Sequence, residues 1–361
     1  MRRLLPVCLG GAALCGLTVL AARRYHGWKH RVRSPAGIQE ARYLPIGGIE
    51  QYIQIRGQDR NNPVLLFLHG GPGSPMAWEA CAWQTALERR YTVVHWDQRG
   101  CGNTYFQNPK AERPTLGLLL SDLDGLMDAL RERFRQERVL LMGHSWGTYL
   151  GAIYARKRPE KVTALVSVSQ MVDFRRSEQV SSWEAARLAE QAGRPRDARE
   201  IRRMLGQLMA CRELDRSAAK GMLELRRLKE RYLPEQYAGQ SLSAYVVSPD
   251  STLRDLRWTF CVGARLESYR EVYRMLLSEK GSSLCGDDLR YQVPVVFVSG
   301  NNDWTTPYPL ALEYYRRITA PRKVFLTMEG VGHLPFLERS EEFSCRVQRA
   351  LEAVCRIPRD Q

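Results

Sequence analysis

A serine flanked by glycines is the first residue of this sequence that could carry out covalent chemistry. Ser145 stands in the middle of Gly-His-Ser-Trp-Gly (143–147), which follows the apolar run 139–142 and precedes a helical stretch at 149–158. The glycines allow a sharp turn between a strand and a helix, which exposes the serine hydroxyl. Because strand, turn and helix signals occur together, we expect Ser145 to be a nucleophile, the alternative being an incidental serine in a tight turn.

A second glycine-rich segment could stabilise the negative charge that forms when such a nucleophile attacks a carbonyl. Residues 69–73 (His-Gly-Gly-Pro-Gly) directly follow the apolar run 64–68. Glycines let backbone N–H groups approach a developing oxyanion closely. We expect an oxyanion hole built from the N–H groups of Gly71 and Trp146, with Gly70 as the alternative to Gly71 and a plain glycine-rich turn as the non-catalytic reading.

An acid and a base follow later in the chain. Asp303 comes after the apolar run 293–298, and His333 lies in a glycine-rich loop after the run 323–327. The order Ser145, Asp303, His333 is that of the catalytic triad of α/β-hydrolases. We expect His333 to be the general base and Asp303 to orient it, although Asp303 alone could equally cap a helix.

The elements that must position these residues alternate along the chain. Between several strand-like runs lie helical stretches, the clearest at 116–136, where leucines recur every three or four residues. Strands that are apolar throughout indicate a mostly parallel sheet covered by helices on both faces, an α/β fold. The predicted strands, all rich in Val, Ile, Leu and Phe, are 51–56, 64–69, 92–96, 138–142, 162–168, 293–299 and 323–327.

The strand signal disappears in one long segment. Residues 171–286 are rich in Arg, Glu, Ala and Leu and predict several amphipathic helices, after which the α/β pattern resumes. We therefore expect a hydrolase core in two parts, 41–170 and 287–361, interrupted by a helical cap at 171–286.

The N-terminus carries an apolar run. Residues 4–22 contain no charge and are flanked by arginine pairs, which predicts a transmembrane anchor at 1–22, a basic tether at 23–40 and a single-pass membrane protein. A cleaved signal peptide or a chance apolar start are the alternatives. The basic residues after the run favour a cytoplasmic catalytic domain by the positive-inside rule, but the side of the membrane stays open.

Composition excludes several other classes of protein. With 44% apolar and 26% charged residues in 361, the chain is neither disordered nor fibrous. The net charge of +15 is concentrated in part at the N-terminus, and no basic face interleaved with aromatic residues predicts a nucleic-acid partner. The nine cysteines show neither metal-ligand spacing nor a disulfide framework, so we expect no metal and no cofactor.

Three motifs together resemble one family. His-Gly-Gly-Pro-Gly, then Asp-Gln-Arg-Gly-Cys-Gly (97–102), then Gly-His-Ser-Trp-Gly resemble the proline iminopeptidases, a family of α/β-hydrolase serine peptidases, over about residues 46–170 and 291–355. Asp97 and Arg99 are expected to hold their loop beside the active site. His144 departs from the Gly-Gly-Ser-Trp-Gly that this family commonly has and is shared with many esterases.

The resemblance implies an activity and a further site residue. A proline iminopeptidase-like enzyme would remove an N-terminal residue through an acyl-enzyme and would bind the substrate ammonium with a carboxylate of its cap. The segment 264–268 (Ala-Arg-Leu-Glu-Ser) is similar to the family's Ala-Arg-Ile-Glu-Asn, which makes Glu267 the candidate, with Glu184 weaker; either could instead be a solvated charge.

Two other functions stay open. The first is a membrane-tethered carboxylesterase or acyl-lipid hydrolase, and the second is a binding protein on an inactive hydrolase scaffold. The expected partner is a small peptide or ester substrate, together with the membrane through the N-terminal helix.

Overall fold

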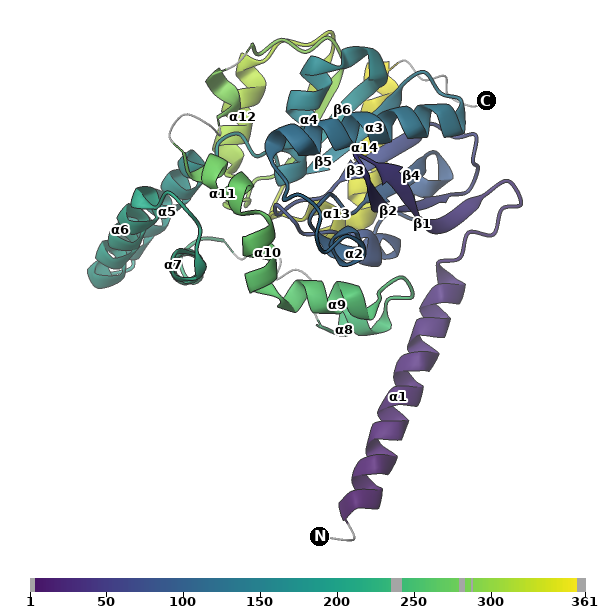
Figure 1. Ribbon diagram of the computed structural model, residues 1–361. Helices are drawn as coiled ribbons and strands as arrows, with labels where there is room; N and C mark the ends of the chain where they lie inside the picture. Colours follow the sequence, from purple (N-terminus) through teal and green to yellow (C-terminus); the bar gives the residue numbers. More distant parts are fainter. Residues whose placement is uncertain (1–3, 235–241, 279–282, 287, 356–361) are drawn as a thin grey trace.

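A single eight-stranded sheet forms the centre of the molecule (Figure 1). The computed structural model describes residues 4–234, 242–278, 283–286 and 288–355, with side chains from Gly16 onward apart from those of residues 242 and 243. The strand order is β1-β2-β4-β3-β5-β6-β7-β8, in which β1 and β2 are antiparallel to their neighbours and the other pairs are parallel. The strands are β1 (Ile38–Ile46), β2 (Ile49–Gly57), β3 (Val64–Leu68), β4 (Thr92–Trp96), β5 (Val139–His144), β6 (Val162–Val168), β7 (Val295–Gly300) and β8 (Lys323–Met328).

Helices cover both faces of this sheet, as the sequence predicts (Figure 1). Alternate residues of β3 enter two different hydrophobic cores: Leu66 and Leu68 belong to the first, and Leu65 and Phe67 to the second. The first core includes residues of α3 (Leu116–Phe134), α4 (Trp146–Lys157) and α12 (Tyr308–Arg317); the second includes residues of α13 (Pro335–Glu338) and α14 (Ser340–Cys355). The predicted α/β architecture, a mostly parallel sheet covered by helices on both faces, is therefore confirmed.

The first strand is an element that the sequence patterns did not reveal. β1 pairs with β2 along its whole length through the turn at Gly47 and Gly48, both with positive φ. It lies at the edge of the sheet, and most of its side chains are exposed or half-buried. An edge strand needs no continuous apolar run, so its sequence resembles a polar linker.

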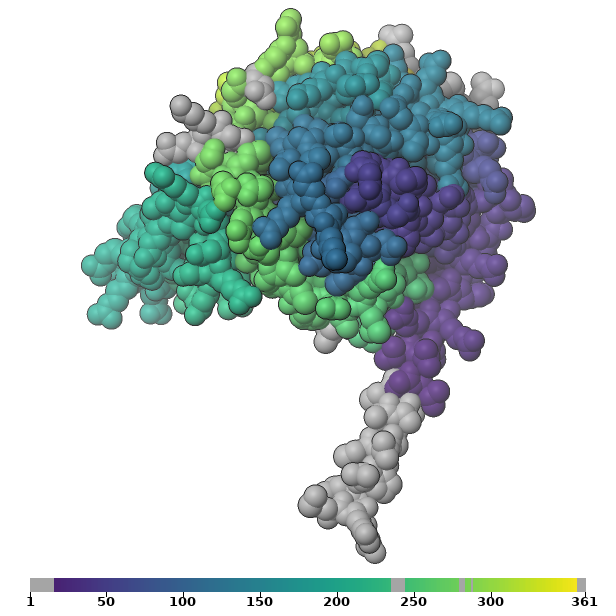
Figure 2. Space-filling model, viewed as in Figure 1, coloured from purple at the N-terminus to yellow at the C-terminus, as the bar shows by residue number. Residues whose placement is uncertain are grey.

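The N-terminal segment forms a helix that extends beyond the apolar run. α1 (Leu4–Lys29) continues past the apolar run 4–22 through a basic end that packs on the rest of the protein, where the Arg23 guanidinium donates to the carbonyl of Ser251 at 2.5 Å (Figure 2). Within the described parts of the chain, none of the helices combines the length and apolar character needed to cross a membrane. On this finding, the prediction of a transmembrane anchor and a single-pass membrane location is wrong.

A helical segment, 174–286, separates β6 from β7 and is called the cap below. Its first three helices project to one side of the molecule, and the later ones pass close to α2 (Gly102–Gln107) (Figure 1). The cap helices are α5 (Phe174–Gln191), α6 (Pro195–Ala210), α7 (Arg216–Lys229), α8 (Leu242–Val247), α9 (Leu253–Phe260), α10 (Val262–Ser268) and α11 (Arg270–Leu277), followed by the 3-10 turn η4 (Leu284–Gly286).

The later cap helices are hydrogen-bonded to two loops at the carboxyl ends of the strands. The Trp258 indole N–H donates to the carbonyl of Gly73 at 2.8 Å, and the Tyr269 hydroxyl donates to the carbonyl of Arg99 at 2.8 Å. The Tyr269 ring lies so close to Gly73 that a Cβ there would approach it to 2.7 Å. These contacts fix α9 and α10 to the loops that follow β3 and β4.

A buried carboxyl group lies in the second of these loops. The amide of Asn103 joins it to the cap, donating to Asp97 at 3.2 Å and to Asp255 at 3.0 Å. The adjacent Arg99 forms a buried ion pair with Asp122 at 2.6 Å, which holds the loop against α3. Burial first, and the nearby Asp255 carboxylate second, raise the pKa of Asp97 to about 8 against the opposing effect of the hydrogen bonds from Asn103.

Asp97 should make the protein less stable as the pH rises from about 4 to 8. In the folded state Asp97 keeps its proton up to a pKa of about 8, whereas the unfolded chain releases it near the ordinary pKa of 3.8. The contribution of this group to the free energy of unfolding is therefore fully present below pH 4 and is lost progressively as the pH rises to about 8. Within this window, the free energy of unfolding should fall by at most about 1.4 kcal/mol per pH unit because of Asp97. Asp97→Asn should flatten the free energy of unfolding across this window, measured by urea denaturation, whereas Asp128→Asn, an exposed acid, should not. An unchanged slope for Asp97→Asn would contradict the assignment.

The packing of α4 on β3 gives a second prediction. A Cβ on Gly147 would lie 2.0 Å from the carbonyl oxygen of Leu68, backbone against backbone, so no rotamer could relieve the contact. Gly147→Ala should lower the midpoint of thermal unfolding by many degrees or abolish folding. The matched control is Gly206→Ala on the exposed face of α6, where a Cβ meets nothing within 4 Å. This change should stabilise the protein by about 0.5–1 kcal/mol; equal effects at both sites would refute the packing argument.

Candidate active site

Ser145 lies on a strained turn between β5 and α4. Its φ of 52° and ψ of −117° place it outside the regions that non-glycine residues normally adopt. The turn is held on both sides, since the Ser145 N–H donates to the carbonyl of Val168 at 3.0 Å and its own carbonyl accepts from Thr148 N–H at 2.9 Å. A strained serine retained by surrounding hydrogen bonds is typical of a functional turn.

The predicted acid and base are in contact. His333 Nδ1 lies 2.9 Å from Asp303 Oδ2, and the Asp303 side chain is fully buried. Its carboxylate also accepts from the N–H groups of Thr305 and Thr306 at 2.9 Å each and from the Thr306 hydroxyl at 2.8 Å. Burial alone would raise the pKa of Asp303, but His333 and these hydrogen bonds outweigh it and lower the pKa. Asp303 thus both caps the following turn and orients the histidine.

A second histidine holds the backbone of the first. His144 Nε2 donates to the carbonyl of His333 at 3.0 Å, and the hydroxyl of Ser169 donates to the same carbonyl at 3.0 Å. Burial lowers the pKa of His144 to about 3, so its ring is neutral. Since Nε2 carries the proton, Nδ1 is an acceptor, and this buried atom has no hydrogen-bond partner among the described residues. The sequence pattern assigned His144 a structural position, and its contacts are those of a residue that positions His333.

The glycine-rich loop after β3 lies directly against the serine turn. A Cβ on Gly70 would be 3.2 Å from Ser145 Cβ and 3.0 Å from His144 Nδ1, so a side chain there would push these neighbours away by a few tenths of an ångström. Gly71 has a φ of +115°. The Trp146 side chain is buried and its indole N–H donates to Gln98 at 3.2 Å. Its backbone N–H belongs to the first turn of α4, where N–H groups have no acceptor within the helix.

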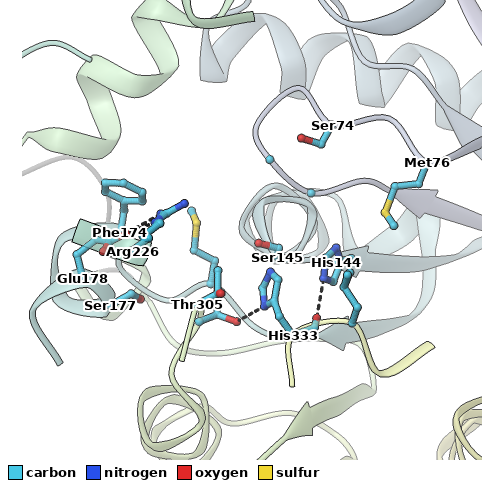
Figure 3. Close-up of a pocket in the computed structure, with 15 residues that line it drawn as sticks. Ser74, Met76, His144, Ser145, Phe174, Ser177, Glu178, Arg226, Thr305 and His333 are labelled. Carbon is cyan, nitrogen blue, oxygen red and sulfur yellow. Dashed lines mark hydrogen bonds and ion pairs between the residues drawn. The ribbon is translucent and has the colours of Figure 1, made fainter. Parts of the chain in front are cut away.

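These groups border one cavity of about 230 Å³ between the core and the cap. Figure 3 shows Ser145 beside the ring of His333, with Ser74 and Met76 on one side and cap residues on the other. The sheet thus brings three distant chain segments to one edge, as parallel strands do at their carboxyl ends. The lining comprises Gly70, Gly71, Ser74, Met76, His144, Ser145, Met171, Phe174, Ser177, Glu178, Arg226, Thr305, Thr306, His333 and Leu334.

Neither of the two cap glutamates predicted from the sequence lines this cavity. Glu267 is half-exposed on α10 and forms ion pairs with Arg113 at 2.5 Å and Arg270 at 2.6 Å. Glu184 pairs with Arg187 on the same helix at 2.6 Å. Both carboxylates are therefore placed as surface ion-pair partners.

A different glutamate, which the sequence patterns missed, does line the cavity. Glu178 on α5 is buried, and both of its neighbours on α7 are cations: Arg226 donates to Oε1 and Lys229 to Oε2. Burial would raise the pKa of Glu178, but the two cations lower it to about 2. The sequence holds a weak signal for this position. Ser177, Glu178 and Ser181 place polar groups on the buried face of α5, where apolar residues would be expected.

Comparison with known proteins agrees with this geometry. Residues 63–340 match the model of the alpha/beta hydrolase fold family. The chain is 28% identical over 318 residues to a probable aminopeptidase, YbaC, of Bacillus subtilis, covering 85% of this chain and 94% of the relative. It is 24% identical over 319 residues to a proline iminopeptidase of Lactobacillus helveticus, covering 86% and 96%.

The solved structures that resemble it include a proline iminopeptidase of Mycobacterium smegmatis, with a TM-score of 0.63 and 22% identity over 88% of this chain and 99% of that one. That likeness supports the fold. The family match extends over most of the chain and includes the loops that carry Ser145 and His333. The protein therefore belongs to the α/β-hydrolase family, and its curated relatives include proteins named aminopeptidases and proline iminopeptidases.

Proposed function

We propose that this α/β-hydrolase is a serine hydrolase that works through an acyl-enzyme. Ser145 attacks an acyl carbon, His333 takes the serine proton and later gives it to the leaving group, and Asp303 stabilises the imidazolium. The observation that carries the proposal is the Asp303–His333 pair at 2.9 Å, set against a strained serine at the same cavity. With Nδ1 of His333 bound to Asp303, Nε2 is the nitrogen left for the serine.

The backbone supplies the second part of the mechanism. The N–H groups of Gly71 and Trp146 are the proposed oxyanion donors, with Gly70 as the alternative to Gly71. The contact of the glycine loop with Ser145 supports this proposal, because a Cβ on Gly70 would lie only 3.2 Å from Ser145 Cβ. Backbone donors that are fixed before the reaction need no reorganisation when charge develops.

The substrate proposed first is a short peptide that loses its N-terminal residue. The support comes from the relatives named aminopeptidase and proline iminopeptidase, which align over most of their own length. A cavity of about 230 Å³ also suits a residue-sized acyl group.

Hydrolysis of a carboxylic ester is the second candidate. One observation favours it: the carboxylate that lines the described part of the cavity, Glu178, is already paired with two cations and is poorly suited to bind a substrate ammonium. An ester substrate needs no such carboxylate.

Removal of the nucleophile or the base tests the catalytic assignment. Ser145→Ala should abolish labelling by a fluorophosphonate probe and lower turnover by about 10³-fold or more, and His333→Gln should be similarly inactive. Ser145→Ala protein should unfold at nearly the parent temperature, because the change removes little packing. A labelled Ser145→Ala protein, or full activity of His333→Gln, would contradict the assignment.

Matched substrates test peptide against ester hydrolysis. An aminopeptidase should cleave Pro-arylamide well and its N-acetylated form poorly, because it must recognise the free amine. An esterase should instead prefer p-nitrophenyl esters and ignore the state of the amine. Glu267→Gln is the matched variant: since Glu267 forms surface ion pairs, we expect its kcat/KM for Pro-arylamide to remain within about twofold of the parent. A selective loss on the free-amine substrate would instead assign ammonium binding to Glu267.

A further inference from the structure

We propose that Arg226 binds an anionic group of the substrate, a carboxylate, within the active-site cavity. This rests on the proposed serine hydrolase function and concerns the class of substrate that the site admits. The proposal gives the cavity a polarity opposite to the one that recognition of an ammonium group requires.

The first argument is the geometry of the guanidinium group. Two of the Arg226 nitrogens, Nε and Nη2, bind a single oxygen of Glu178, at 2.9 and 2.5 Å. A guanidinium has five N–H groups, and among the described residues Nη1 has no acceptor. The group therefore presents its outer edge, the one that pairs two N–H groups with a carboxylate.

The second argument is where that edge lies. Arg226 lines the cavity that contains Ser145, and 35% of its side chain is exposed against 5% for Glu178. Figure 3 shows Arg226 and Glu178 on the cap side, facing the space beside Ser145 and His333. Glu178 thus fixes the arginine from behind and leaves its far edge open to a bound molecule.

The third argument is the local charge. Lys229 Nζ lies 2.7 Å from the second oxygen of Glu178 and 2.8 Å from the Ser181 hydroxyl, and it is buried. Arg226, Lys229 and Glu178 together carry a charge of +1. The other acid that acts on both cations is Glu230, which is exposed, so solvent screens its charge. One cation would be enough to neutralise Glu178. The second cation makes this corner of the cavity favourable for an anion and unfavourable for an ammonium group.

The remaining described lining does not cancel this charge. His144 is neutral, and the charge of Asp303 is directed to His333 and the turn at Thr305 and Thr306. The other neighbours on the cap side are apolar or hydroxyl groups, Met171, Phe174 and Ser177. In such surroundings a charge-assisted hydrogen bond is less screened than in water.

The carboxylate could belong to either side of the scissile bond, so the test uses two matched pairs of substrates. The dipeptide Pro-Gly against Pro-glycinamide places the charge on the leaving group. Mono-4-nitrophenyl glutarate against 4-nitrophenyl butyrate places it on the acyl group. In at least one pair, the full-length protein should give a kcat/KM about tenfold or more higher for the charged member, after correction for the uncatalysed rate.

Variants then assign the preference to the arginine. Arg226→Met should reduce the ratio of charged to neutral substrate to about one, and Arg226→Lys, which keeps the charge without the planar edge, should retain part of it. Arg203→Met, which removes an exposed arginine paired with Glu200 on α6, is the control and should behave as the parent. A preference for the neutral member in both pairs, or an undiminished ratio in Arg226→Met, would overturn the proposal.

A binding experiment separates this proposal from the proposed function. Ser145→Ala protein should be stabilised against thermal unfolding by Pro-Gly or glutarate more than by Pro-glycinamide or glutaramide, and the additional Arg226→Met change should remove the difference. This result would support the anion site even if no tested substrate were hydrolysed. Equal stabilisation by charged and neutral ligands would count against it, while fluorophosphonate labelling of the parent shows independently whether Ser145 is reactive.

Discussion

The close approach of α4 to β3 is the constraint on which the site depends. Gly147 brings the start of the helix into backbone contact with the end of β3, next to the turn where Ser145 has its positive φ, and places the helix N-terminus beside the glycine loop. A bulkier residue at position 147 would separate the serine from that loop. The strain at Ser145 is thus maintained by the packing of the parallel sheet, which is the most deeply buried part of the molecule.

Around this turn, buried polar groups are matched with donors and acceptors. Asp303 is fully buried yet ionised because His333 and the turn that follows it supply its hydrogen bonds. In the cap, Glu178 stays ionised because two cations flank it. The two carboxylates have different partners: Asp303, behind the cavity wall, directs a histidine, and Glu178, in the lining, holds an arginine.

Residues with a strong local signal could be predicted from the sequence, and those set by tertiary packing could not. Ser145 and the glycine loop follow apolar buried strands, so their positions at one sheet edge follow from the parallel topology. β1 was missed because an edge strand carries no apolar run. The N-terminal apolar run suggested a membrane anchor, but its helix continues into a basic end that contacts Ser251. In the cap, sequence similarity pointed to Glu267, which forms surface ion pairs. The glutamate that lines the cavity is Glu178, which the packing of α5 on α7 turns inward. The sequence of an amphipathic helix does not show which of its polar residues will face a neighbouring helix.

The hydrogen bonds from Trp258 and Tyr269 attach one half of the cap more firmly to the loops of the core than the other half. α9 and α10 share backbone contacts with the loop beside Ser145, so any displacement of these helices would also distort the proposed oxyanion donors. α5 to α7 project away from the sheet (Figure 1), and α5 is joined to the core by an exposed ion pair between Arg176 and Glu313 of α12 at 2.9 Å. Because an exposed ion pair contributes little to stability, a displacement of α5 to α7, which carry Arg226, would disturb the loops beside Ser145 less than a displacement of α9 and α10.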